Sequence, residues 1–443
     1  MIRQFFTMWL LILITNNLLG QNSVYYYIEI DSNTTNHTEV FRNAIEKSDK
    51  IFIPKGKYYL EYDKLKTTGS IELCGEKGTV IEGIGNAKFN SLKPLAIFEI
   101  INPEDVYIHE ISFTGKFNVA TAISLQQSLY DSPNNKTNVT IENNSVSELG
   151  LVWIGPKNGF TFNRLHEEYE NWAQSGPINT NNWVSNIKIK NNKCIGDKTF
   201  YSGNFRGSSI SAITMLYSNN MLIEFNIISN YRFGIWSYGG ASKSRNGNKL
   251  SKNNILSKNI KVNNNHIEET YSPIWFSRTK NVEVYDNLTI NNQDVALDVE
   301  GCQDVVMYNN TVKNSRGGAL VTLNGSKNVI FKHNNIYMEN YNKHNNIVFI
   351  RDGNSDIEYL NNYMEFNDNR IIDKRNARVF IKNSSIEIPS NVRIIFKNNE
   401  LNNVGFDVRN GGQIQLNNNK FRSNITSKQR NIKLSEDSKI MNY

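Results

Sequence analysis

The sequence predicts an all-β fold, a right-handed parallel β-helix solenoid of about ten or more coils with a capping helix at its N-terminal end. Three observations predict it. A short motif recurs with the spacing of a solenoid coil, asparagine is abundant because of that motif, and short segments between the motifs alternate apolar with polar residues. No helical period of comparable strength runs through these segments.

The motif reads apolar, any residue, polar, Asn, any residue, apolar. It appears at residues 141–146, around Asn144, and at residues 189–194, around Asn192. Later copies centre on Asn226, Asn265, Asn287, Asn310, Asn334, Asn362, Asn399 and Asn419. From Asn265 to Asn362 the steps are 22, 23, 24 and 28 residues, which suits one coil of about three short strands. The longer steps elsewhere indicate loops inserted between coils.

Asparagine suits this motif for two physical reasons. It tolerates the left-handed backbone region better than other non-glycine residues, so we expect it at a sharp bend between strands. Stacked on the same residue of the next coil, its amide can also form a hydrogen-bonded ladder. Residues 281–285 and 328–332 alternate, so one face is buried and the other wet. Ten coils spaced by ~4.8 Å would make a rod of about 50 Å.

The N-terminal region has the features of a cap. Residues 38–47 form a short amphipathic segment, and residues 51–58 read Ile-Phe-Ile-Pro-Lys-Gly-Lys-Tyr. With these motifs and the repeat, residues 24–425 resemble the pectate-lyase-like superfamily of right-handed parallel β-helix carbohydrate-active proteins. The resemblance implies a helix that covers the first coil and its open strand edge. It leaves the reaction open, because the superfamily contains lyases, hydrolases, epimerases, esterases and tailspike adhesins.

The ends of the chain suggest three parts. Residues 1–20 read as an export signal: Arg3 precedes an apolar stretch too short to cross a bilayer, and Gly20 offers a cleavage point. A membrane anchor is the competing interpretation of that stretch. Residues 21–425 form the β-helix domain, and residues 426–443, which lack the motif, form a C-terminal tail. We expect a secreted protein, periplasmic or extracellular, with no membrane span.

Charge and cysteine content narrow the partners. The net charge of +7 and a pI near 9.0 favour an anionic glycan, and export makes nucleic acid the least natural partner. Cys74, Cys194 and Cys302 make no disulfide framework; we interpret them as core thiols, with at most one pair. No Cys/His cluster has zinc-ligand spacing.

Aligning the coils on the turns at Asn281, Asp304 and Asn328 predicts which strand residues face outward. The inward pairs are Ile274 and Phe276, Leu297 and Val299, and Val321 and Leu323. The outward pairs are Thr214 and Leu216, Trp236 and Tyr238, Trp275 and Ser277, Asp298 and Glu300, Thr322 and Asn324, and Phe349 and Arg351. Arg232, Tyr271, Asp294 and Arg316 precede these strands, and Arg278 follows one of them.

The outward aromatic and basic residues suggest a sugar-binding face. Trp236 and Trp275 would expose two apolar faces on neighbouring coils unless sugar rings, or the loop at residues 151–183, stack on them. Tyr238 and Tyr271 would extend these subsites. Guanidinium groups bind carboxylate or sulfate in bidentate fashion, which is the role we assign to Arg232, Arg278, Arg316 and Arg351.

Asp298 and Glu300 are the candidate catalytic pair. They alternate on one strand with Cα atoms ~6.6 Å apart, so both carboxyl groups face the same side. Such a pair suits glycoside hydrolysis, one group being protonated by repulsion from the other and by the apolar Trp275. The runner-up is a lyase of an anionic glycan, in which the pair would hold Ca²⁺ beside an Arg or Lys base; no other cofactor is expected. The third alternative is a non-catalytic glycan-binding adhesin with a structural acid pair.

Overall fold

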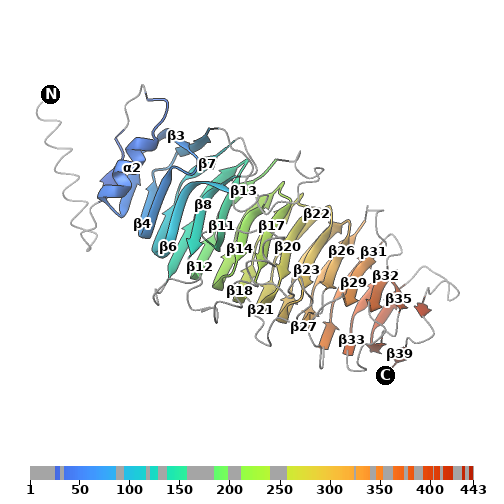
Figure 1. Cartoon of the computed structure of the whole chain (residues 1–443). Helices are drawn as coiled ribbons and strands as arrows, with labels where there is room; N and C mark the ends of the chain where they lie inside the picture. Colours follow the sequence, from blue (N-terminus) through green and yellow to red (C-terminus); the bar gives the residue numbers. More distant parts are fainter. Residues whose placement is uncertain are drawn as a thin grey trace, which may run out of the picture.

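The computed structural model describes most of the chain as a rod of stacked β-strands (Figure 1). The described residues are 25–29, 34–85, 94–115, 120–127, 137–156, 184–197, 211–239, 257–323, 326–339, 346–352, 363–373, 378–383, 393–402, 404–409, 413–422, 432–434 and 439–442. All strand pairs in these residues are parallel. In this described part of the chain the strands form two hydrogen-bonded sheets, of 26 and 13 strands. The larger one has two faces that are joined through two long strands near the cap; we number these faces sheets 1 and 2, and the smaller sheet is sheet 3.

Sheet 1 carries the candidate site. Its strands are β4 (Leu65–Gly75), β6 (Leu95–His109), β8 (Ala120–Gln127), β11 (Gly150–Pro156), β14 (Ser211–Leu216), β17 (Phe233–Tyr238), β20 (Ser272–Ser277), β23 (Val295–Glu300), β26 (Gly318–Leu323), β29 (Asn346–Asp352), β32 (Arg378–Asn383), β35 (Gly405–Arg409) and β38 (Ile432–Leu434). The long strands β4 and β6 continue into sheet 2, because the second half of β6 pairs with β9 instead of β8.

Sheets 2 and 3 complete each coil. Sheet 2 holds β1 (Tyr26–Tyr27), β2 (Lys50–Ile53), the second halves of β4 and β6, β9 (Asn138–Glu142), β12 (Ser185–Lys190), β15 (Asn219–Glu224), β18 (Ser257–Asn263), β21 (Thr279–Tyr285), β24 (Gln303–Tyr308), β27 (Lys327–Lys332), β30 (Tyr363–Asn367), β33 (Arg393–Lys397), β36 (Gln413–Asn417) and β39 (Lys439–Asn442). Sheet 3 holds β3 (Gly56–Glu61), β5 (Thr79–Ile84), β7 (Ser112–Thr114), β10 (Ser145–Ser147), β13 (Lys193–Ile195), β16 (Ile227–Ser229), β19 (His266–Glu268), β22 (Leu288–Asn292), β25 (Thr311–Ser315), β28 (Asn335–Met338), β31 (Arg370–Asp373), β34 (Glu400–Asn402) and β37 (Lys420–Arg422).

These sheets confirm the predicted right-handed parallel β-helix. Within the described ranges sheet 3 contributes thirteen strands, one to each coil, so the rod is about 60 Å long at ~4.8 Å a step. Alternate residues face a continuous apolar interior; Val282 and Val284, for example, are buried, as the sequence predicts. Further along the rod, Phe331, Phe366 and Phe396 stack with ring centroids 5.1 and 4.4 Å apart.

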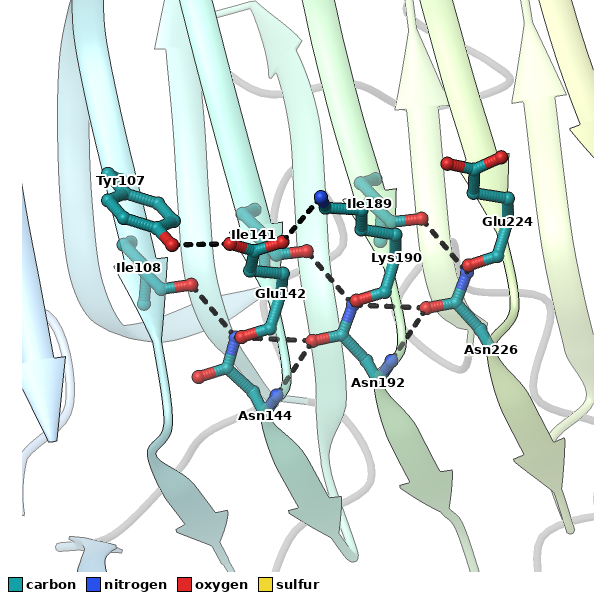
Figure 2. A network of polar contacts seen from close by, with 10 residues as sticks. All are labelled: Tyr107, Ile108, Ile141, Glu142, Asn144, Ile189, Lys190, Asn192, Glu224 and Asn226. Atoms are coloured by element: carbon teal, nitrogen blue, oxygen red, sulfur yellow. Dashed lines mark hydrogen bonds and ion pairs between the residues drawn. The ribbon is translucent and has the colours of Figure 1, made fainter. Parts of the chain in front are cut away.

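The predicted asparagine ladder is present, with two corrections. Each side-chain Nδ2 donates to the Oδ1 of the next asparagine at 2.9–3.1 Å, along Asn144, Asn192, Asn226, Asn265, Asn287, Asn310, Asn334, Asn369, Asn399 and Asn419 (Figure 2). Asn369 therefore takes the place predicted for Asn362, which lies outside the described residues. The left-handed bend also falls one residue earlier than predicted, for example at Asn264 and Asp286.

The separation of these two roles has a physical reason. The ladder asparagine must point its amide inward, where it also donates to two backbone carbonyls; for Asn287 these belong to Val262 and Tyr285. The preceding residue turns the chain and needs only to tolerate positive φ. Asparagine or aspartate usually fills that position, but Phe225 and His333 occupy it in two coils, with φ near 55°.

The N-terminal cap is confirmed. Helix α2 spans Thr38–Lys47, with the bounds predicted from the sequence, and lies across the N-terminal end of the rod (Figure 1). Its Phe41 is buried edge-on against Tyr58, with centroids 5.4 Å apart. Tyr58 in turn donates a hydrogen bond to the Pro54 carbonyl at 2.8 Å, which ties the cap to the first coil.

The structure also bears on the predictions for the two chain ends and the three cysteines. Residues 1–20, the predicted export signal, lie outside the described residues. The parallel stack extends past residue 425, where we predict a tail to begin, because β38 pairs with β35 and β39 with β36. The three cysteines are free thiols; Cys194 and Cys302 are buried, while Cys74 is half-buried. In the described part of the chain, no helix is both long and apolar enough to cross a bilayer.

Candidate functional site

The outer face of sheet 1 has two rows of side chains that run along the rod. The first row is Trp153, Thr214, Trp236, Trp275, Asp298, Val321 and Phe349, and the second row is Leu216, Tyr238, Ser277, Glu300, Leu323 and Arg351. The register from β14 to β23 is the predicted one: Trp236 pairs with Trp275, and Trp275 pairs with Asp298. The buried inward neighbours Ile274 and Leu297 belong to the core.

The predicted register is wrong by one residue at β26. Asp298 pairs with Val321 and Glu300 with Leu323, so Val321 and Leu323 face outward. Thr322, predicted to face outward, is buried opposite Val299. The cause is compositional, because β26 reads Gly-Ala-Leu-Val-Thr-Leu and its apolar residues do not alternate. The predicted outward Asn324 lies outside the described residues.

The first row is not the exposed surface that its position suggests. Trp236 is fully buried and Asp298 is 7% exposed, yet neither belongs to the core cluster. Part of the cover comes from the aromatic rings themselves. The Trp236 and Trp275 rings stack at 5.6 Å with a 19° interplanar angle, and Phe233 contacts them at 5.6 and 5.1 Å. The guanidinium of Arg232 lies 5.3 Å from the Phe233 ring.

Asp298 is a buried carboxyl group with a raised pKa. Burial raises the pKa of its carboxyl well above the usual range, and the charges of Glu300 and Asp294 raise it further, while a hydrogen bond from the Val299 backbone works the other way. Burial is thus a larger cause than the predicted mutual repulsion. Its Oδ1 has no hydrogen-bond partner among the described residues, and neither has the buried Nε1 of Trp275 on the neighbouring strand.

A partly exposed rim surrounds this buried acid. Glu300, Trp275 and Tyr271 are all half-buried. Burial raises the pKa of the Tyr271 hydroxyl, and the charge of Asp294 and a hydrogen bond to it raise that pKa further. Tyr271 also lies under Arg232, whose guanidinium is 5.7 Å from the ring. The buried acid therefore has polar and aromatic side chains at its edge that remain accessible to solvent.

The predicted arginines occupy different parts of this rim. Arg278 bends back over the next coil, because a Cβ added to Gly301 would lie 2.5 Å from its Nη1. Gly301 has φ of +60°, so both its backbone and this contact favour glycine. Arg316 lies one coil further, in the turn before β26, with Nη1 3.4 Å from Gln293 Oε1. The side chain of Arg351 lies outside the described residues, although its backbone continues the second row.

The residues near Asp298 do not form a calcium site of the usual kind. Ca²⁺ takes six to eight oxygen ligands. Across the described ranges no three His, Cys, Asp or Glu side chains gather in a way that could hold a metal ion. The first-row neighbours of Asp298 are Trp275 and Val321, which offer no oxygen ligand.

The sequence reasoning missed several members of this face. Phe233 completes the aromatic cluster. Residues 151–183 are predicted to form a loop, but residues 151–156 belong to β11, and residues 157–183 lie outside the described residues. Trp153 therefore lies in the first row, two strands from Trp236, with its ring over Gly155. Further toward the cap the row is polar: the buried Glu99 accepts a hydrogen bond from Gln126 at 3.0 Å and lies 3.4 Å from the Lys66 ammonium. The motif spacing that revealed the later coils is absent there, so the register of these strands could not be predicted.

Comparison with solved structures identifies the fold. A family 28 exopolygalacturonase from Yersinia enterocolitica matches with a TM-score of 0.53 and 14% identity, over 94% of this chain and 78% of that one. The catalytic domain of a GH87 alpha-1,3-glucanase in complex with tetrasaccharides matches with a TM-score of 0.50 and 11% identity, over 95% and 68%. The surface protein and adhesin PfbA of Streptococcus pneumoniae matches with a TM-score of 0.49 and 11% identity, over 94% and 100%.

These likenesses show the fold alone, because the identities are low. The chain has the parallel β-helix fold that these proteins share. At the level of sequence, no family model matches the chain and no curated protein matches it.

Proposed function

We propose that this protein is a glycoside hydrolase that cleaves a polysaccharide at the outer face of sheet 1, where β20 and β23 lie side by side. Asp298 would protonate the glycosidic oxygen as the general acid. Glu300, two residues on and facing the same side of β23, would act as the base or nucleophile. The fold shared with an exopolygalacturonase and an alpha-1,3-glucanase supports a carbohydrate substrate.

One observation carries this proposal: Asp298 is a buried acid with an unsatisfied oxygen beside an unsatisfied indole N–H. A buried polar atom without a partner costs about 1–3 kcal/mol, so a ligand that supplies the partner recovers that free energy on binding. A sugar hydroxyl both donates and accepts, so once the side chains that cover these two buried atoms move aside, it would supply what Trp275 and Asp298 lack. Burial raises the pKa of the Asp298 carboxyl, which favours the protonated form that a general acid needs.

Substrate binding would use the rim of half-buried side chains. Trp275, Tyr238 and Tyr271 present aromatic groups on which sugar rings can stack. Trp236, buried on the neighbouring strand β17, stacks against Trp275 and holds its ring in place. The guanidinium groups of Arg232, Arg278, Arg316 and Arg351 would bind acidic groups of the chain. The net charge of +7 would draw an anionic polysaccharide toward this surface.

The calcium-dependent lyase is the weaker alternative, because the donor set around Asp298 does not suit Ca²⁺. A hydrolase and a lyase differ in their products. A hydrolase releases reducing ends without a double bond, whereas a lyase leaves an unsaturated sugar that absorbs in the ultraviolet.

The test is to incubate the purified protein with a panel of neutral and acidic plant and algal polysaccharides, and to record both reducing ends and ultraviolet absorbance. Asp298→Asn and Glu300→Gln should each lower kcat by about 10²–10⁴. Asp304→Asn is the matched control. It removes a carboxylate from the next turn, and asparagine can keep both the φ of 54° and the hydrogen bond from Asn328.

Two outcomes would overturn the proposal. Ultraviolet-absorbing products whose formation stops with a chelator would identify a lyase. Glycan binding without cleavage, unchanged in both acid variants, would identify an adhesin-like binding protein. Export is tested separately, by sequencing the N-terminus of the protein secreted from its native cell; a mature chain that begins near Gln21 would agree with the proposed signal.

A further inference from the structure

A second polar groove lies on the outer face of sheet 2, away from the two rows of sheet 1. It has a volume of about 590 Å³ and crosses five consecutive coils, from β2 through β4, β6 and β9 to β12. At ~4.8 Å a coil it is about 19 Å long, enough for several sugar rings in a row. None of the residues assigned to the hydrolase lines it.

The centre of the groove is a row of side chains held in place by one another. The Tyr107 hydroxyl donates a hydrogen bond to one oxygen of Glu142, and the Lys190 ammonium lies 2.7 Å from the other (Figure 2). Burial acts to raise the pKa of Glu142, but the hydrogen bonds from Lys190 and Tyr107 outweigh it, so the pKa is lowered and the group stays ionised. Figure 2 shows this row next to the asparagine ladder, whose hydrogen bonds hold the strands that carry the row in register.

The same three residue types meet again two coils toward the cap, here with the tyrosine and the lysine on the same side of the carboxylate. The Tyr25 hydroxyl donates to one oxygen of Glu72, and the Lys50 ammonium lies 3.6 Å from the other. Between the two carboxylates the Tyr107 ring is fixed by stacking on His109, with centroids 4.1 Å apart and a 20° interplanar angle. The groove therefore presents two carboxylates and an aromatic ring whose positions are set before any ligand arrives.

Such a surface suits a sugar chain. Each carboxylate can accept about four hydrogen bonds, so Glu72 and Glu142 retain capacity for sugar hydroxyls after their internal contacts. Because these side chains are already held in place, binding a ligand costs less of their conformational entropy. Glu142 is 13% exposed on its side chain, so the group is fixed but still reachable from solvent.

The charge of the groove selects the class of sugar chain. Its lining holds four carboxylates and three lysines, a near balance with one negative charge in excess. A polyuronate or sulfated chain would meet repulsion from the carboxylates, whereas a neutral chain would not. Two of the three lysines are already paired with carboxylates, Lys190 with Glu142 and Lys50 with Glu72.

We propose that this groove is a second carbohydrate-binding site, which holds a neutral polysaccharide chain across the five coils from β2 to β12 and takes no part in bond cleavage. It does not depend on the hydrolase proposal, because it uses neither Asp298 nor Glu300. Its role would be to keep the protein on a polysaccharide surface while the other face works.

Calorimetric titration of the whole protein with short cello-, xylo-, manno- and laminari-oligosaccharides tests this proposal, with oligogalacturonides as the acidic counterpart. At least one neutral series should bind. Tyr107→Ala should raise the Kd of that series about tenfold, which corresponds to losing roughly 1.4 kcal/mol of binding free energy from the contact between the tyrosine ring and a sugar ring. Glu142→Gln, which preserves shape, should weaken binding of that series as well. Asp298→Asn should bind like the wild type.

Tyr285→Ala is the matched control. Tyr285 lies on the outer face of sheet 2, half-buried and stacked on Tyr308 at 4.9 Å, about five coils or 24 Å from Tyr107. It should leave binding unchanged, and the circular dichroism of each variant reports on its folding. No binding of any neutral series, equal affinities for wild type, Tyr107→Ala and Glu142→Gln, or tighter binding of the acidic series would each overturn the proposal. Loss of binding in Asp298→Asn would assign the binding to the face of sheet 1.

Discussion

Replacing Asn287 by alanine tests whether the asparagine ladder stabilises the rod. The Asn287 amide donates to the Val262 and Tyr285 carbonyls at 2.9 and 3.0 Å and to Asn310 Oδ1 at 3.0 Å. Its own Oδ1 accepts from both the backbone N–H and the Nδ2 of Asn265, each at 3.0 Å. The Asn287→Ala variant would remove all five hydrogen bonds from a fully packed interior.

The magnitude follows from the groups left without these partners. Asn310 Oδ1 keeps the hydrogen bond from the backbone of residue 287, and Asn265 Nδ2 keeps its two carbonyl acceptors. The Asn265 backbone N–H loses its acceptor, and the Val262 carbonyl loses the amide that donates to it. Two buried backbone groups at about 1–3 kcal/mol each predict a loss of about 2–6 kcal/mol in the free energy of unfolding.

The assay is urea unfolding, followed by circular dichroism and by tryptophan fluorescence. Asn335→Ala is the control, because Asn335 lies one residue beyond a ladder position, is half-buried, and has no side-chain hydrogen bond among the described residues. It should cost less than about 0.5 kcal/mol. The reasoning fails if Asn287→Ala costs no more than Asn335→Ala at an unchanged slope of free energy against urea.

Three further predictions follow from the backbone and the burial of single residues. Phe225 is 52% exposed and has φ of 55°, so Phe225→Asn should raise the free energy of unfolding by about 1 kcal/mol. The control is Ile227→Asn, which removes a 47% exposed apolar group at a position without a left-handed backbone. Urea unfolding should show no gain in stability for this control. Burial lowers the pKa of His109 below its usual 6.5, and this outweighs the nearby carboxylates. The folded state therefore binds fewer protons than the unfolded state, so the free energy of unfolding should fall as the pH drops from 6.5 through the folded pKa. An NMR titration midpoint of 6.5 or higher would contradict this. Gly301→Ala should cost about 1–2 kcal/mol through its φ of +60° and displace the Arg278 guanidinium; a melting temperature equal to the wild type would refute it.

How much the sequence predicted depended on whether a pattern recurs. The ladder was predictable because each coil repeats its asparagine, and the register of β20 and β23 because their apolar residues alternate. In β26 the alternation disappears, and the prediction slipped by one residue. Asn362 and Asn369 both follow polar residues, so the motif alone could not choose between them.

The chemistry of the candidate site was harder to predict than its position. Alternation places Asp298 on the outer side of its strand, but it cannot tell whether that side is open to water. The structure buries the outer carboxyl, and burial is the main reason for its raised pKa. The groove of sheet 2 depends on contacts between residues far apart in sequence, such as Tyr107 with Glu142, which no local motif announces.

The direction of the asparagine ladder gives the rod an electrical polarity. Every link in the described chain runs the same way, from the Nδ2 of one coil to the Oδ1 of the coil nearer the C-terminus. The amide dipoles therefore add along the axis, as peptide dipoles add along an α-helix. Neighbouring hydrogen bonds aligned in this way polarise one another, so each coil that joins the row strengthens the links already formed.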